Sequence, residues 1–329
     1  MPKQFPTGLL KVFIIHSPSL DIRKQHIKKF VDILDSVKID YEYVESYEPN
    51  KITQQDVQQK VDLSKKNTGE LFDELVRNLH VNQISNALKH CEAINLANKV
   101  QDKYENFLFV EDDILFGDDM IEKLREALTL YRNDTNDILF LGLPSLAPIE
   151  HKNQIQIIPT TQFYKLFPCC ESYLIKAATI SKIAPLVYPI KYVTNFQLSY
   201  IATTNNLQTT MVVPNIFLDG SKYGAFLSSI DPNNKMLFNP EFIKLANLVQ
   251  SNASSQVIES TFDSIKFRNH PDVMHLQAIY LMSKGDYAKA ETILENILQL
   301  TTQNGCIINN ETEFLLTYMR LHKFTQDLV

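Results

Sequence analysis

The sequence contains no tryptophan and no long apolar run, and positive charge is in short supply. No segment reaches the roughly 20 apolar residues that a membrane-spanning helix needs. The first residues also lack the charged-then-apolar layout of a signal peptide. The net charge of −6 and the pI near 5.8 provide no overall basic field for nucleic acid or an anionic membrane. We therefore predict a cytoplasmic protein with no membrane span and no nucleic-acid partner.

Cysteine is also scarce, with four residues in the whole chain. They form neither a paired C-x-x-C pattern nor a dense disulfide framework, so the sequence disfavours structural zinc and secretion. Cys169 and Cys170 are adjacent, and a disulfide bond between adjacent cysteines is strained and uncommon. We expect both of them to be buried thiols.

The first half of the chain alternates short β-branched or aromatic runs with amphipathic stretches. These patterns predict strand 11–15, helix 21–34, strand 41–44, helix 81–104, a strand from residue 107, helix 120–131 and strand 137–142. Residues 48–66 are polar and weakly periodic, which indicates a long excursion with a short helix. Such an order is typical of a mostly parallel, doubly wound α/β sheet, which binds ligands at the carboxyl ends of its strands.

The second half has a mixed pattern followed by a helical tail. It predicts strands at 163–167, 172–175 and 209–213, with a helix at 177–186, which fits an antiparallel part added to the sheet. Residues 271–300 resemble one tetratricopeptide hairpin, with Ala278 and Ala290 at its close-packed positions, and residues 311–321 predict a last helix. We predict a catalytic domain over residues 1–236 and an all-helical domain over 237–329, an appendage rather than a peptide-binding array.

Three carboxylates follow the apolar run 107–110 without a break: Glu111, Asp112 and Asp113. Like charges at the end of a buried strand have raised pKa values or require a cation, and a divalent metal is the natural partner. The alternative is an acidic surface turn that caps the helix expected to begin near Asp118, because acids favour helix N-termini.

Further motifs stand around this triplet in chain order: Arg23 after the first strand, Lys89-His90 followed by Ala93-Ile94, the strand 137–142 and the stretch 172–176. Together with Glu-Asp-Asp, they resemble glycosyltransferase family 25, whose members include lipooligosaccharide and collagen galactosyltransferases of GT-A fold. The resemblance covers residues 11–230 and leaves the helical tail out. The loop Asp-Gly-Ser-Lys-Tyr-Gly at 219–224 is similar to versions from large DNA viruses and their hosts.

The resemblance implies a metal-dependent, inverting transfer of a hexose, glucose or galactose, from a UDP-sugar to a hydroxyl of a glycan or protein. Hard oxygen ligands and a diphosphate favour Mn²⁺ or Mg²⁺, which would stabilise the leaving group as a Lewis acid. We expect Asp113 to contact the metal, with Glu111 as a second ligand and Asp112 or Glu111 at the ribose or a metal-bound water.

The other candidate residues have less specific signals. Contacts to the sugar nucleotide are expected from His16, Arg23, His90, Ser221 and Lys222. For Arg23 the alternative is a solvated helix charge, and for His90 a core histidine. The base that accepts the acceptor's proton is Asp219 or Glu171, and the sequence does not choose between them.

Several positions depart from the family pattern. His16, Lys89 and Lys176 replace other polar residues, and Asn195 stands where the family often carries an aspartate. These departures and the repeat-like tail support a second class, a catalytically silent binding or scaffold protein. A metal-dependent phosphatase or nuclease ranks last, because no second Asp/His cluster is visible. The tail is also a candidate for homo-oligomer contacts.

Overall fold

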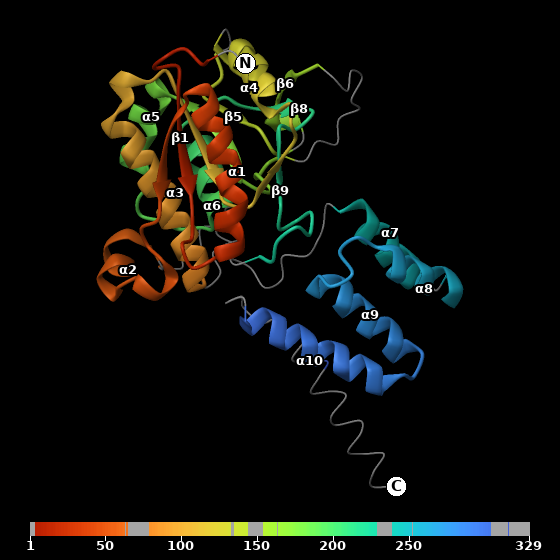
Figure 1. The fold of residues 1–329 in the computed structure, drawn as a ribbon. Coiled ribbons are helices and arrows are strands. Elements are labelled where there is room, and N and C mark those ends of the chain that lie inside the picture. Colours follow the sequence, from red (N-terminus) through yellow and green to blue (C-terminus); the bar gives the residue numbers. More distant parts are fainter. Residues whose placement is uncertain are drawn as a thin grey trace. The chain divides into compact units, whose positions relative to one another are not determined.

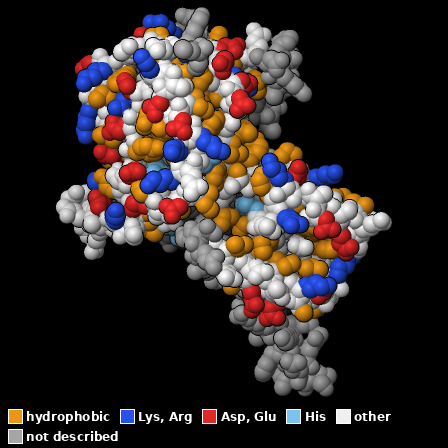
Figure 2. Space-filling view, in the orientation of Figure 1, with side chains coloured by type: hydrophobic (Ala, Val, Ile, Leu, Met, Phe, Trp, Pro, Cys, Tyr) orange, Lys and Arg blue, Asp and Glu red, His pale blue; other side chains and the backbone are white. Residues whose placement is uncertain are grey.

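A computed structural model describes residues 4–62, 64, 79–132, 135–143, 154–162, 164–228, 239–251, 253–303 and 315. The chain divides into two compact units, Met1–Asp219 and Gly220–Val329. None of the described helices combines the length and apolar character that crossing a bilayer requires. On the face drawn in Figure 2, acidic and basic side chains are interspersed over the surface of the first unit.

The first unit is built on a seven-stranded sheet in the order β2-β1-β3-β7-β5-β8-β6. Its strands are β1 Leu10–Ile15, β2 Asp40–Val44, β3 Asn106–Glu111, β5 Ile138–Phe140, β6 Gln156–Pro159, β7 Ser172–Lys176 and β8 Thr209–Val213. Strands β2, β1, β3, β5 and β8 run in one direction, whereas β7 and β6 are antiparallel to their neighbours. Most of the described strands are therefore parallel, with an antiparallel contribution from the second half.

Helices cover both faces of this sheet (Figure 1). Successive side chains of a strand point to opposite faces, so Val12 and Ile14 join one hydrophobic cluster while Phe13 and Ile15 join the other. The first cluster includes residues of α1 Asp21–Val37 and α4 Met120–Arg132, and the second residues of α3 Val81–Lys99, α5 Ala177–Ile183 and α6 Thr194–Thr204. This arrangement is the doubly wound α/β class that the sequence predicts, and it is consistent with a GT-A-like fold.

The sheet topology gathers chain segments at the edge where β3 ends. Because β7 is antiparallel to β3, its first residues lie beside the last residues of β3, and the Glu111 amide donates to the Glu171 carbonyl at 2.8 Å. The Leu141 amide donates to the Ser172 carbonyl at 3.1 Å, which brings the end of β5 to the same edge. A second, two-stranded sheet pairs β4 Ile114–Phe116 with β9 Phe217–Asp219 and places Asp219 opposite Ile114.

All regular secondary structure among the described residues of the second unit is helical. The unit contains α7 Pro240–Gln250, α8 Ser255–Ser264, α9 Pro271–Ser283 and α10 Tyr287–Gln303. Ala278 and Ala290 are fully buried in one cluster of α9 and α10, and small side chains there allow the two helices to approach closely. Gly285 supplies the positive φ of 81° that the turn between the helices requires.

Two local sequence predictions need comment. Residues 164–167 of the predicted strand 163–167 form no strand. Phe167 instead packs its ring against Phe140, with centroids 4.4 Å apart, and Pro168 follows it. The antiparallel edge strand is β6, at Gln156–Pro159. The excursion after β2 contains the expected short helix, α2 Gln54–Lys60. The predicted helix at 311–321 lies outside the described residues apart from residue 315.

Candidate functional site: an acidic cluster at the end of β3

Asp112 is held by three groups from the segment that follows β1. His16 Nδ1 lies 2.9 Å from Asp112 Oδ2, the Ser17 amide donates to the same oxygen at 3.0 Å, and Arg23 Nη1 donates to Oδ1 at 2.9 Å. Burial opposes ionisation of Asp112, but the charge of Arg23 and the hydrogen bonds prevail and lower its pKa to about 2. Asp112 is therefore ionised, and both of its carboxylate oxygens are engaged by protein groups.

A second buried network fixes the same segment from the side of α3. Lys89 Nζ donates to the His16 carbonyl at 2.8 Å and to Ser17 Oγ at 2.9 Å, and it forms a buried ion pair with Glu48. Glu48 also accepts from Ser17 Oγ at 3.0 Å and Ser19 Oγ at 3.1 Å. Lys89 thus orders the turn that carries His16 and leads into the helix of Arg23.

Glu111 is engaged by two side chains one helical turn apart on α3. Its Oε1 lies 3.1 Å from Asn86 Nδ2 and 3.0 Å from His90 Nε2, while His90 Nδ1 lies 2.9 Å from the Tyr173 hydroxyl. Burial disfavours the charged form, but the hydrogen bond and charge of His90, with help from Asn86, lower the pKa of Glu111 overall. Glu111 and His90 are therefore joined by a hydrogen bond at this edge, and Tyr173 orients the imidazole.

Asp113 has a different environment from its two neighbours. Arg23 Nη2 lies 3.2 Å from Asp113 Oδ2, but that guanidinium is shared with Asp112. Burial, together with the nearby carboxylates of Asp219, Glu111 and Asp112, outweighs Arg23 and raises the pKa of Asp113 to about 7. A carboxyl in this state takes up either a proton or a cation near neutral pH.

Glu171 lies at the same sheet edge and is only 2% exposed. Its side chain occupies space left by Gly142 at the end of the β5 segment. A Cβ atom at Gly142 would lie 1.9 Å from Glu171 Oε1 and 2.8 Å from Ser172 Oγ. The glycine in the Asp-x-x-x-Leu-Gly segment therefore makes room for this carboxyl group.

Asp113 and Asp219 have the ligand chemistry that a hard divalent cation prefers. Both offer carboxylate oxygens, and their mutual repulsion contributes to the raised pKa of Asp113. Among the described residues, a different group of three has all its ligand atoms within 4.8 Å of one another, namely His90, Glu111 and Cys170. Glu111 belongs to this second group, so the expected Glu111–Asp113 pair of metal ligands stays a prediction.

The structure brings most of the predicted site residues to one edge of the first unit. His16, Arg23, Asp112 and Asp113 form one connected group, and His90 joins Glu111. Glu171 and Asp219 lie at the same edge through β7 and the β4–β9 pair. Ser221 and Lys222 belong to the second unit, so their expected contact with a diphosphate stays a prediction.

The residues of the site that were not predicted from the sequence include Glu48, Asn86, Cys170 and Tyr173. Asn86 and His90 are four residues apart on α3, so they share a face with the buried residues of that helix. A polar pair at this spacing among the apolar residues of the helix was an available signal. Glu48 and Tyr173 stand 41 and 83 residues from their partners Lys89 and His90, and no local pattern points to such contacts.

Comparisons with known proteins add little to this geometry. No protein-family model matches the chain, and no curated protein sequence matches it either. Among solved structures, the chain is similar to a glycosyltransferase involved in the glycosylation of the major capsid of PBCV-1. The TM-score is 0.29 and the sequence identity 10%, over 54% of this chain and 66% of that chain. The chain thus spans slightly less than two thirds of the length of that protein.

Proposed function

We propose that the protein is a glycosyltransferase that moves a hexose from a UDP-sugar to a hydroxyl group of a glycan or protein, using Mn²⁺ or Mg²⁺. The observation that carries the proposal is the position of Asp113. It is a buried carboxyl at the carboxyl end of a central strand. The negative charge of Asp219 acts on it, and Arg23 forms an ion pair with it. Ligands of doubly wound sheets bind at this edge. A nucleoside diphosphate with a divalent cation suits a site that combines carboxylates with a guanidinium.

In this reaction the residues of the site would have different roles. Asp113 and Asp219 would hold the cation, which when bound stabilises the negative charge of the departing diphosphate. Arg23 stays charged because Asp113 and Asp112 raise its pKa against the effect of burial, and it orients Asp113. With Asp219 at the cation, Glu171 is the candidate to take the acceptor's proton; Asp219 is the alternative base if the cation is held without it.

The test measures binding and turnover separately. Thermal shift with UDP and UDP-hexoses, with and without Mn²⁺, reports binding, and release of UDP in the presence of sugar acceptors reports transfer or hydrolysis. We expect stabilisation by UDP that requires Mn²⁺ and disappears in Asp113→Asn. The matched control is Asp119→Asn, because the Asp119 side chain is 61% exposed and lies six residues away on the same segment. Mn²⁺-dependent stabilisation that survives Asp113→Asn would contradict the metal assignment.

One observation favours the alternative of a silent transferase fold. Asn195, which stands where the resembling family often carries an aspartate, donates from Nδ2 to the Phe167 carbonyl at 2.8 Å. Asn195 therefore stabilises the loop at Phe167 and offers no carboxylate for catalysis. Binding of UDP and Mn²⁺ without UDP release from any hexose donor, over a panel of glycan and protein acceptors, would support the scaffold function.

A further inference from the structure

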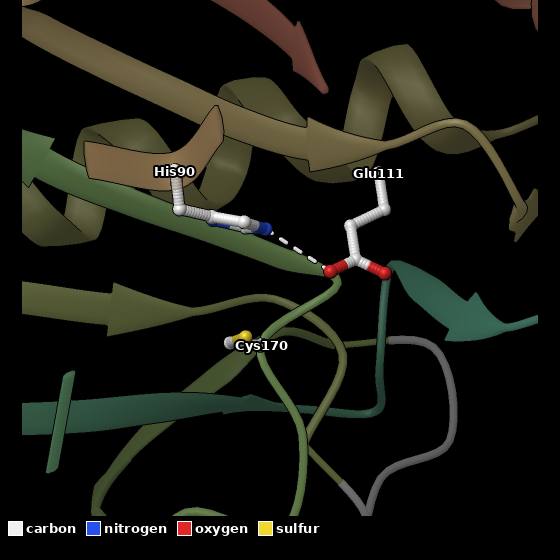
Figure 3. A group of neighbouring side chains, drawn as sticks. All are labelled: His90, Glu111 and Cys170. Carbon is white, nitrogen blue, oxygen red and sulfur yellow. Dashed lines mark hydrogen bonds and ion pairs between the residues drawn. The ribbon is translucent and has the colours of Figure 1, made fainter. Parts of the chain in front are cut away.

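A second group of potential metal ligands lies beside the acidic cluster and has a different chemistry. His90 comes from α3, Glu111 from the end of β3, and Cys170 from the segment before β7 (Figure 3). One ligand atom from each lies within 4.8 Å of the others, and His90 Nε2 lies 3.0 Å from Glu111 Oε1. His90 and Cys170 are 3% and 6% exposed. Three separate elements thus bring nitrogen, oxygen and sulfur donors to one enclosed point.

This donor set selects a class of metal. A thiolate and an imidazole suit Zn²⁺ and similar borderline or soft ions, whereas Mn²⁺ and Mg²⁺ prefer all-oxygen sites such as Asp113 and Asp219. Three protein ligands also leave a fourth position of a tetrahedral ion for water or another molecule. The two groups therefore differ in the ion they would take, although they are close together in the fold.

The surroundings of His90 resemble the support that metal-binding histidines usually have. Its Nδ1 lies 2.9 Å from the Tyr173 hydroxyl, and the two rings are stacked with centroids 5.8 Å apart and planes 17° apart. A hydroxyl can either donate or accept, so Tyr173 can accept from Nδ1–H when Nε2 binds an ion. Such an outer partner fixes the ring and the tautomer of a metal-bound histidine.

We propose that His90, Glu111 and Cys170 form a binding site for Zn²⁺ or a chemically similar thiophilic divalent ion. Binding releases the proton of the Cys170 thiol and any proton on His90 Nε2, and it replaces the direct His90–Glu111 hydrogen bond with metal–ligand bonds. No electron transfer is involved. The proposal goes beyond the transferase reaction, and its test needs no turnover.

The test uses Co²⁺ as a spectroscopic substitute for Zn²⁺ on the full chain, after removal of metals with a chelator. We expect one equivalent of Co²⁺ to produce the thiolate-to-cobalt charge-transfer absorption, and Zn²⁺ to displace it. Cys170→Ser should abolish this absorption, and His90→Gln should weaken Co²⁺ binding by roughly 10- to 100-fold. The matched control is Cys169→Ser, because Cys169 is the adjacent buried thiol and lies outside the group.

A measurement on the unaltered protein guards against variants that fail to fold. X-ray absorption of the Zn²⁺-loaded chain should show one sulfur ligand at about 2.3 Å together with nitrogen and oxygen ligands at about 2.0–2.1 Å. A coordination shell without sulfur, or equal loss of the cobalt absorption in Cys169→Ser and Cys170→Ser, overturns the proposal. Asp113→Asn should retain the absorption, so failure of the hard-cation site and failure of this site give different results.

Discussion

Asp112 and Asp113 are neighbours in sequence and equally buried, at 3% exposed each, yet their environments are opposite. Asp112 faces His16, the Ser17 amide and Arg23, and its pKa is lowered to about 2. Asp113 contacts the second nitrogen of that guanidinium, and burial together with the charge of Asp219 raises its pKa to about 7. Burial alone therefore does not decide the state of a carboxyl group, because the partners supplied by other elements do.

The two aspartates of this acidic motif differ in the elements that surround them. The Asp112 side is tied to the turn after β1, which Lys89 and Glu48 also hold. The Asp113 side meets the β4–β9 pair, which contributes another carboxylate. One side of the motif stabilises the fold, and the other is suited to an added cation.

The largest expected loss of stability is on the Asp112 side. Asp112→Ala should lower the free energy of unfolding by about 3 kcal/mol, because it leaves Arg23 and His16 buried without the carboxylate that pairs with them. Urea denaturation followed by circular dichroism measures this change. Asp119→Ala, at an exposed position, should change it by less than about 0.5 kcal/mol. Equal effects of the two substitutions would show that the paired Asp112 carboxylate does not stabilise the fold.

The Asp113 side should respond in the opposite direction. The pKa of Asp113 is about 7 in the folded chain against an ordinary value of 3.8, so the folded chain binds more protons between these values. Stability is then lost as the pH rises from about 4 to about 7. Asp113→Asn should therefore raise the free energy of unfolding of the metal-free protein by about 4 kcal/mol at pH 8.

The same substitution should have a smaller effect at pH 5, about 1.5 kcal/mol, because Asp113 is then still protonated in the folded chain and already ionised in the unfolded chain. Paired urea titrations of the wild type and Asp113→Asn at pH 5 and pH 8, both with chelator, measure the difference. If the substitution changes the free energy of unfolding equally at both pH values, the pKa of Asp113 is not raised in the folded chain.

A smaller effect is expected at Gly142, which makes room for Glu171. Gly142→Ala should destabilise the chain by about 1 kcal/mol, because the flexible end of Glu171 must move away from the new methyl group. The cost should shrink in a Glu171→Ala background, which a double-mutant cycle detects. Gly117→Ala is the control, since its Cβ would approach Asp119 Oδ1 no closer than 3.0 Å. An unchanged cost in the Glu171→Ala background would remove Glu171 from this contact.

Much of the architecture could be predicted because burial on both faces of the sheet leaves a simple pattern. The run 107–110 is fully buried in β3, and the apolar residues of α1 recur every three or four positions. The three-residue strands β4 and β9 are too short to leave a period. Helix α6 was missed because its apolar residues are only weakly periodic.

The site could be predicted only in part, for a related reason. The acidic triplet is continuous in sequence, so its position at a strand end was visible. What distinguishes Asp112 from Asp113 comes from Arg23, which is 89 residues from Asp112, and from Asp219. Likewise, Cys170 lacked any spacing signal for a metal, because its possible co-ligands come from α3 and β3. Contacts between distant segments decide such chemistry, and a single sequence does not record them.

The affinity for Mn²⁺ as a function of pH tests the assignment of Asp113 most directly. Isothermal titration of Mn²⁺ in the presence of UDP would be run at pH 8 and pH 6 on the wild type, Asp113→Asn and Asp119→Asn. Because a proton competes for Asp113 near its pKa of about 7, we expect wild-type affinity to be about tenfold weaker at pH 6 than at pH 8. Asp119→Asn should behave like the wild type, and Asp113→Asn should bind weakly at both pH values. Equal Mn²⁺ affinity in Asp113→Asn and the wild type at pH 8 would contradict a metal site at Asp113.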